Sequence, residues 1–266
     1  MNPLLAERAG ECAPRPATGL AGLPGLPSAP VPDPGARPLR HFEPAPPVVL
    51  HERILRMQGY ADMSRVRPAI ASAAQAMARR AEALSRPAVA YQYRPLLALD
   101  DEGMELSGGA RLKSRAFATR MTGCTQIAPF VLSCGMELGH TVVALADAGD
   151  LLEAVLLETA GWLCIEDATR QFKALLQAQA AARGMRITSR MGPGYAYRVG
   201  EAEVNWPLED QVAFFALFGA EPLPVTLMSS CAMNPKLSRS GLYGVAPLHN
   251  LTHRAGRPGI SEDTTP

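Results

Sequence analysis

The fold depends on residues 151–182, LLEAVLLETAGWLCIEDATRQFKALLQAQAAA, which contain no proline. If this stretch is helical, apolar residues occupy nearly every side of the helix as far as Ile165, and the helix is amphipathic beyond it. Gly184 supplies a residue that commonly ends a helix. We therefore predict one long helix here. Because a helix that is apolar all round is usually buried, this helix should run through the core.

The sequence before this helix predicts shorter elements of both kinds. Val66, Ile70 and Met77 lie on one apolar stripe at helical spacing, and the proline at 87 should end that helix. A turn at residues 100–103 separates two short runs with strand-like composition, which predicts a hairpin. The expected elements in chain order are a helix over 62–86, a hairpin over 88–107, a helix over 111–121, a strand over 126–135 and a helix over 137–148.

The sequence after the long helix predicts one further helix and one strand. Pro207, just after Trp206, suits the first turn of a helix that would bury Phe214, Leu217 and Phe218. LPVTLMSS, residues 223–230, is typical of a strand, and residues 233–245 are expected to form a Gly/Ser-containing turn region. Strands and helices alternate without a regular βαβ repeat. The fold class expected is therefore α+β, a single domain with a mixed or antiparallel sheet and packed helices.

The two ends of the chain differ in composition from the middle. Twelve of the 24 prolines fall within the first 47 residues, mixed with alanine and glycine. Such a segment has too little apolar surface to offset its ordering entropy, so residues 1–47 are expected to be a disordered leader. The polar residues 251–266 are expected to be a flexible tail. The folded domain should then cover residues 48–250.

Composition excludes several classes of function. The net charge is +1, so no global field favours nucleic acid, and no stretch reaches the roughly 20 apolar residues of a membrane span. Five cysteines without a C-x-x-C motif, and no apolar secretory signal, favour a reduced cytoplasmic protein. Phosphate-binding, dinucleotide-binding, zinc-protease and serine-hydrolase motifs are absent from the sequence. With five scattered histidines, no metal site is expected.

Three segments in order resemble one family, the activation domain of cobalamin-dependent methionine synthase and its free-standing relatives. The sequence RMGPGY, residues 190–195, is similar to the family's R-x-x-x-G-Y motif at the S-adenosylmethionine site. NWPLEDQ, residues 205–211, followed by LPVTLMSS, is similar to the family's next segment. MNPKLSRSG, residues 233–241, resembles its M-x-P-x-x-S-x-S-G signature. The resemblance spans roughly residues 50–247 and implies the family's fold.

The resemblance implies a set of ligand-binding residues. Arg190 would bind the methionyl carboxylate, with Gly192 and Gly194 allowing close approach of the backbone, and Glu166 would take the ammonium or ribose hydroxyls. Tyr195 would line the ligand and face the corrin. The remaining corrinoid-facing residues implied are Ser238, Ser240 and Gly241.

Each of these residues also has a purely structural interpretation. The Gly-Pro-Gly sequence is first of all a turn-forming device, and Glu166 could pair with Arg170 one helical turn away. Tyr195 could anchor the turn against the core, and the two serines could cap turns. In the family a pair of tyrosines follows the M-x-P-x-x-S-x-S-G signature. Residues 246–250 of this chain contain no such pair.

The function implied is binding of S-adenosylmethionine and reductive methylation, or reactivation, of cob(II)alamin on a separate corrinoid methyltransferase. The partner would be a methionine synthase core that lacks this domain and carries the cobalamin, with flavodoxin or ferredoxin as reductant. The chain has no D-x-H-x-x-G motif that would hold the corrinoid itself. The alternatives are a non-catalytic adaptor or escort of a corrinoid protein, and reactivation of a different corrinoid methyltransferase system.

Overall fold

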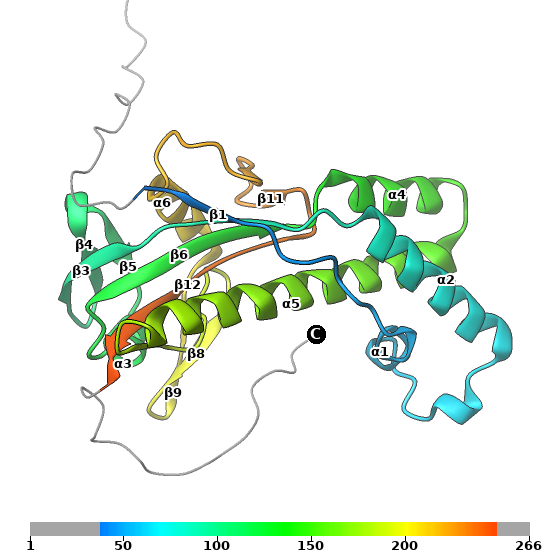
Figure 1. Ribbon diagram of the computed structural model, residues 1–266, viewed down its shortest axis with the longest axis horizontal. Coiled ribbons are helices and arrows are strands. Elements are labelled where there is room, and N and C mark those ends of the chain that lie inside the picture. The colour runs from blue at the N-terminus through cyan, green and yellow to red at the C-terminus, as the bar shows by residue number, and fades with distance from the viewer. Residues whose placement is uncertain (1–37, 249–266) are drawn as a thin grey trace, which may run out of the picture. The chain divides into compact units, whose positions relative to one another are not determined.

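The computed structural model describes residues 38–248, and its centre is an eight-stranded sheet in which every strand pairing is antiparallel (Figure 1). The strand β6 (Gln126–Ser133) occupies the middle. β12 (Ser238–Pro247) pairs with one edge of β6, and β2 (Ala88–Tyr91) and β3 (Arg94–Leu99) share the other. The outer strands are β1 (Arg40–Phe42), β4 (Gly103–Leu106), β5 (Arg111–Lys113) and β7 (Met185–Ile187).

The long helix α5 (Leu151–Ala181) covers one face of this sheet, as Figure 1 shows. Its Phe172 side chain is fully buried and packs against Phe130 of β6 and Tyr243 of β12. Three helices pack around its N-terminal half: α1 (His51–Met57), α2 (Pro68–Leu84) and α4 (Met136–Asp147). The prediction of a long, buried helix is confirmed, and Gly184 follows its end with a φ of 65°.

A second hydrophobic core contains side chains from β6 and β12 together with Phe117, Trp206 and Phe214. The edge of the Trp206 indole lies against Phe117, with ring centroids 4.8 Å apart. This second core includes residues of the short helices and hairpins between β4 and β12. Those elements are α3 (Ala116–Arg120), β8 (Ala196–Val199), β9 (Ala202–Asn205), α6 (Gln211–Ala216), β10 (Thr226–Leu227) and β11 (Met233–Asn234), together with 3₁₀ turns at Ser107–Gly109 and Leu208–Asp210. A further 3₁₀ turn, Met63–Arg65, lies between α1 and α2, and Met63 packs against the core beneath α5.

The α+β class with an antiparallel sheet is therefore confirmed, but β12 corrects the expected turn region at residues 233–245. The glycines and serines that suggested turns lie inside a ten-residue strand at the centre of the sheet. Their small size is required by packing. A Cβ atom on Gly244 would lie 2.5 Å from Cys124 Sγ and 2.6 Å from Met121 Sδ. Glycine in a strand often marks such a close approach.

Two further sequence predictions are wrong in detail. The expected strand at residues 223–230 is reduced to Thr226–Leu227, which pairs only with Met233–Asn234 in a separate two-stranded ribbon. The expected helix at 111–121 begins as a strand, because Arg111–Lys113 pairs with β4 before α3 starts. In both cases tertiary pairing overrides the local pattern.

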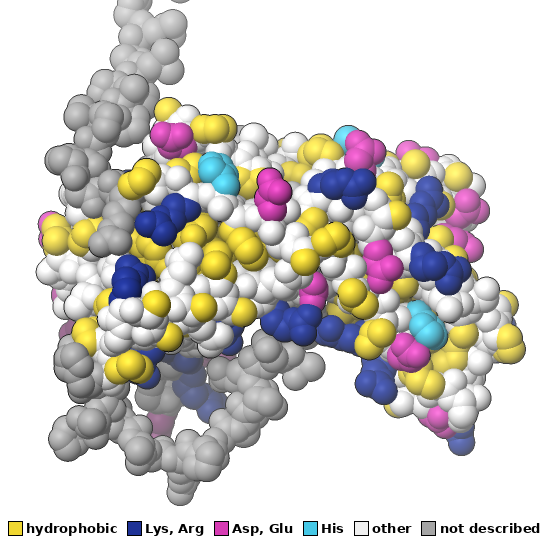
Figure 2. Space-filling model, viewed as in Figure 1, with side chains coloured by type: hydrophobic (Ala, Val, Ile, Leu, Met, Phe, Trp, Pro, Cys, Tyr) yellow, Lys and Arg dark blue, Asp and Glu magenta, His cyan; other side chains and the backbone are white. Residues whose placement is uncertain are grey.

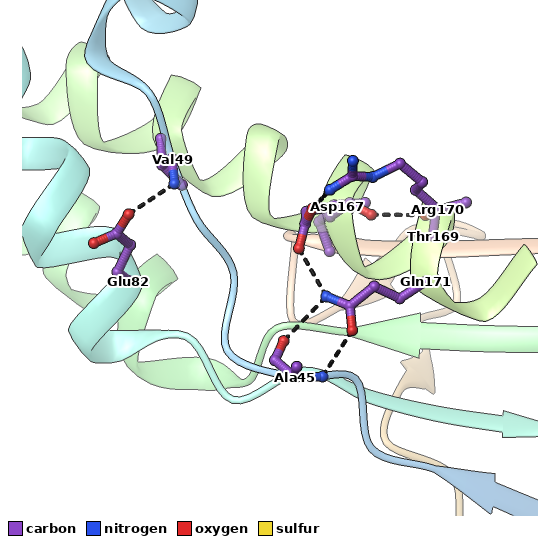
Figure 3. A network of polar contacts seen from close by, with 8 residues as sticks. Ala45, Val49, Glu82, Asp167, Thr169, Arg170 and Gln171 are labelled. Atoms are coloured by element: carbon purple, nitrogen blue, oxygen red, sulfur yellow. Dashed lines mark hydrogen bonds and ion pairs between the residues drawn. The ribbon is translucent and has the colours of Figure 1, made fainter. Parts of the chain in front are cut away.

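The expected leader extends too far into the chain, because residues 38–47 are part of the described structure. Arg40–Phe42 pairs with β2, and the Gln171 side chain of α5 binds Ala45 through both its backbone groups (Figure 3). Gln171 Oε1 accepts from Ala45 N at 2.8 Å, and Gln171 Nε2 donates to Ala45 O at 3.2 Å. Glu82 likewise accepts from Val49 N. The remainder of the leader and the expected tail lie outside the described residues.

Candidate functional site

The segment that carries the R-x-x-x-G-Y pattern runs beside the central strand β12. Met191 exchanges two backbone hydrogen bonds with Leu242, with N···O distances of 2.9 and 2.7 Å. Before it, Thr188 N donates to Gly244 O at 2.9 Å, which extends the pairing that begins in β7. This backbone register fixes the place of Arg190, because the neighbouring residue Met191 is buried in the second core.

Arg190 crosses β12 directly over Gly241. A Cβ atom on Gly241 would lie 3.3 Å from Arg190 Cγ and 2.6 Å from Met191 O. No side chain larger than hydrogen therefore fits at position 241 without moving the turn. The sequence assigned Gly241 to a corrinoid face, and the structure shows that its immediate neighbours are Arg190, Met191 and Phe130.

The Arg190 guanidinium reaches the ring of Tyr195, with Cζ 4.9 Å from the ring centroid. Its Nη1 atom is buried and has no hydrogen-bond partner among residues 38–248. A buried donor left without an acceptor costs about 1–3 kcal/mol, and more for a charged group. Tyr195 is 46% exposed and Arg190 is half-buried, so the pair lies at the edge of the core. One N–H group of the Arg190 guanidinium is therefore unpartnered beside a partly exposed tyrosine.

The glycine turn between these two residues is held by Tyr197 of β8. The Tyr197 hydroxyl accepts from Gly192 N at 2.6 Å and donates to Gly192 O at 2.9 Å. Burial raises the pKa of this hydroxyl, so it stays protonated and able to donate. Gly194 has a φ of 85°, a backbone conformation that favours glycine, and its N–H donates to Trp206 O at 2.7 Å.

Glu166 lies on α5, and its carboxylate pairs with Arg239 of β12 rather than with Arg170. The Arg239 Nη2 to Glu166 Oε1 distance is 3.1 Å, and Arg239 Nη1 donates to Thr169 Oγ1 at 3.1 Å. Arg170 pairs with Asp167, so the alternative Glu166–Arg170 pair is not formed. The Glu166 side chain is 44% exposed.

The structure brings Glu166 and Arg190 to the same face of β12. Arg239 and Gly241 are two residues apart in a strand and therefore point to the same side, about 7 Å apart. Glu166 contacts the first of these residues and Arg190 lies over the second. The Glu166 carboxylate and the Arg190 stem therefore lie at neighbouring positions along β12.

Ser238 and Ser240 have buried, internally bonded hydroxyls. Ser238 Oγ donates to Pro235 O at 2.7 Å, three residues earlier, as the turn-capping alternative requires. Ser240 Oγ donates to Gln211 Oε1 at 3.0 Å, and Gln211 Nε2 donates to Cys231 O. These bonds connect β12 to α6 and to the turn after β10. A corrinoid-facing role for the two serines remains a prediction.

Two site residues were missed by sequence reasoning, Tyr197 and Arg239. Arg239 occupies an unspecified position of the M-x-P-x-x-S-x-S-G signature. Residues 233–245 were expected to form a turn region, so the strand alternation that directs Arg239 towards α5 was not considered. Tyr197 lies in β8, two residues after Tyr195. Its spacing from Tyr195 matches the alternation of side chains in a strand, and this is the only feature of the sequence that could have indicated a role for Tyr197 at the turn.

Neither described cavity is lined by Arg190, Tyr195 or Glu166. They measure about 210 and 250 Å³ and lie between α4 and the segments around Pro224 and Pro235. Within residues 38–248, no three His, Cys, Asp or Glu side chains are grouped so as to hold a metal ion. No helix in that range is long and apolar enough to cross a membrane.

The fold belongs to a class of α+β domains in which a curled antiparallel sheet packs against one long helix. A solved structure shares it: the crystal structure of the MetH reactivation domain bound to AdoHcy, with a TM-score of 0.50. The match covers 80% of each chain at 14% sequence identity. At that identity the similarity establishes the fold alone. No family model and no curated protein matches the sequence.

Proposed function

We propose that this chain binds S-adenosylmethionine at the Arg190–Tyr195 turn and supports reductive methylation of a cobalamin carried by a separate corrinoid methyltransferase. The observation that carries the proposal is the buried Arg190 Nη1, which has no acceptor among residues 38–248. The structural neighbour, which has AdoHcy bound, adds support from the fold. The partner we favour is a methionine synthase core without its own activation domain, with flavodoxin or ferredoxin as electron donor.

The residues of the turn fit such a ligand. A guanidinium with an unpartnered N–H matches a carboxylate. Gly192 is buried, and a Cβ atom there would lie 3.4 Å from Arg190 Nη1, so the glycine lets the guanidinium lie against the turn. The exposed Tyr195 ring offers an apolar face for an adenosyl group or for the corrin. Glu166 would bind the ammonium or the ribose. Its carboxylate would then either release Arg239 or bind the ligand while still paired with Arg239.

Little acid–base chemistry is needed from the protein. The partner's corrinoid supplies the nucleophilic metal, and the sulfonium of the ligand leaves as a neutral thioether. The task left to the chain is to hold the methyl group in line and to exclude water. Arg190 would serve the first requirement by holding the carboxylate end of the ligand, and Gly241 leaves room for the arginine stem, since a Cβ atom there would lie 3.3 Å from Arg190 Cγ.

The experiment is an anaerobic assay with a purified corrinoid methyltransferase, a reductant and S-adenosylmethionine. We expect this chain to accelerate formation of the methylated corrinoid, followed by its absorption spectrum, and Arg190→Ala to lose most of the acceleration. Ligand binding without any methylation above the chain-free control would favour the adaptor or escort function. Methylation only with a different corrinoid protein would assign the chain to another methyltransferase system.

A further inference from the structure

The corner between α4 and α5 exposes several apolar side chains that no described element covers. Val143 is 59% exposed, Leu151 is 64% exposed and Val155 is 48% exposed. Leu151 and Val155 are four residues apart, so they lie on one face of α5, and Glu158 continues that face. Val143 lies on α4, three residues after His140. These residues form an apolar stripe that we call the α4–α5 stripe.

The α4–α5 stripe leads into the cavity of about 210 Å³. His140 and Val143 of α4 line this cavity, as does Glu158 of α5. The opposite wall is the segment Pro235–Leu237, which precedes β12. A volume of this size accommodates one large apolar side chain with room to spare. In protein interfaces, pockets of this kind receive the anchor residues that dominate affinity.

The Asp, Glu, Lys and Arg side chains that α4 and the first two turns of α5 contribute are all negative. From Met136 to Glu158 the chain contains no lysine and no arginine. Figure 2 shows acidic, apolar and basic side chains at the end of the molecule where α4 meets α5, so the charge contributed by this segment is taken from its sequence. The acidic residues of this segment are Glu137, Asp147, Asp150, Glu153 and Glu158.

Two cations close to the cavity and to the start of α4 are engaged by other groups. Lys236 lines the cavity but is paired with Glu158. The Arg86 stem lies near Gly135, before α4, and its guanidinium donates to the carbonyls of Ala83 and Ser85. An incoming partner therefore meets an apolar strip bordered by carboxylates.

We propose that the α4–α5 stripe and its cavity dock an amphipathic helix of a partner protein whose apolar face is flanked by lysine and arginine. One apolar residue of that helix would fill the cavity, and its neighbours would cover Val143 and Val155. The flanking cations would face Asp147, Asp150 and Glu153, which sets orientation and speeds encounter. The proposal does not rest on the proposed function, because Arg190 and Tyr195 are not part of this surface.

The charge pattern disfavours two other occupants. A symmetric dimer through this surface would bring the acidic residues of one copy against those of the other, and like charges at an interface are unfavourable. An anionic lipid surface would be repelled by the same carboxylates. The stripe therefore selects a basic protein helix.

The test uses the full chain and a fluorescent synthetic helix of about five turns, with leucine on one face and lysine on the other. Fluorescence anisotropy should show saturable binding, and a peptide with glutamate in place of lysine should not bind. Each of Val143→Ser and Val155→Ser should weaken binding about tenfold, since each removes apolar area from the contact. The matched controls Leu97→Ser and Val212→Ser change equally exposed apolar residues elsewhere and should leave binding unchanged.

A charge-reversed variant separates docking from nonspecific stickiness. Asp150→Lys combined with Glu153→Lys should abolish binding of the lysine peptide and create binding of the glutamate peptide. Equal affinity of the Val143 and Leu97 variants for the lysine peptide would overturn the proposal. So would binding of the wild-type chain to vesicles rich in phosphatidylserine, or a wild-type dimer in light scattering that Val143→Ser dissociates.

Discussion

The Tyr197 hydroxyl binds both backbone polar groups of Gly192, accepting from its N–H at 2.6 Å and donating to its carbonyl at 2.9 Å. Gly192 and Gly194 carry no side chain, and Pro193 between them is buried. Tyr197 therefore supplies side-chain hydrogen bonds that hold the backbone between Arg190 and Tyr195.

Tyr197→Phe should weaken ligand binding without unfolding the protein. The substitution leaves the backbone N–H and the backbone carbonyl of Gly192 without this partner, at a cost of about 1–2 kcal/mol. We expect a thermal midpoint lower by a few degrees and a several-fold loss of AdoHcy affinity by calorimetry. The control is Tyr195→Phe, which keeps the ring beneath Arg190. A Tyr197→Phe protein with wild-type affinity would show that the hydrogen bonds between Tyr197 and Gly192 are not required for ligand binding.

Gly241→Ala should be strongly destabilising, because the new methyl group would meet Met191 O at 2.6 Å and Arg190 Cγ at 3.3 Å. Both neighbours belong to the segment that pairs with β12, so relief requires that segment to move. The matched change is Gly139→Ala in α4, where a Cβ would have no atom within 4 Å. That variant should be more stable by roughly 0.5–1 kcal/mol, as expected for alanine in a helix. Urea unfolding compares the two, and equal effects would contradict this packing account.

The sequence predicted the elements whose signals are local. The apolar surface of residues 151–165 and the glycines at 149 and 184 define α5 and its neighbour α4 without reference to the rest of the chain. The hairpin of β3 and β4 likewise follows from its turn residues. These features depend on periodicity and on backbone preference, which act within a few residues.

The elements that were missed depend on distant partners. The sequence of β12 suggests a turn because it contains glycines. These glycines are explained by close packing against Met121, Cys124 and Met191, which lie far from β12 in the sequence. The pairing of Glu166 with Arg239 spans 73 residues, so helical spacing suggested Arg170 instead. The turn after Arg190 could be predicted from its sequence motif. The hydrogen bonds from Tyr197 to Gly192 could not, because they depend on how the chain folds back on the turn.

Deletions at the N-terminus should distinguish two parts of the proline-rich segment. Removing residues 1–37 should leave the thermal midpoint nearly unchanged, since their composition offers little apolar surface. Removing residues 1–47 also removes β1 and the two bonds between Ala45 and Gln171, so the midpoint should fall. The expected difference is several degrees by differential scanning calorimetry. Identical midpoints for the two truncations would show that β1 contributes nothing to stability.

The buried thiols predict a loss of stability at high pH. Burial raises the pKa of Cys134 to about 11 and that of Cys164 to about 12, from an ordinary value of 9.0. A folded-state pKa above the unfolded value means that the neutral thiol stabilises the fold below pH 9, and that this contribution is lost as pH rises towards 11–12. Chemical denaturation between pH 8 and 10.5 should show the decline, and Cys134→Ala combined with Cys164→Ala should reduce its slope. An unchanged slope in that variant would contradict the assignment.

The central claim is that Arg190 receives the carboxylate of an S-adenosyl ligand, and titration calorimetry with AdoHcy tests it most directly. Wild-type protein should bind, and Arg190→Ala should lose about 2–3 kcal/mol of binding free energy, the scale of a charge-assisted hydrogen bond. Arg190→Lys should recover part of the loss, because an ammonium cannot form two parallel bonds to a carboxylate. Arg186→Ala, an exposed arginine of β7, serves as the matched control and should bind normally. No binding by the wild-type chain, or equal affinity of a folded Arg190→Ala variant, would contradict the account.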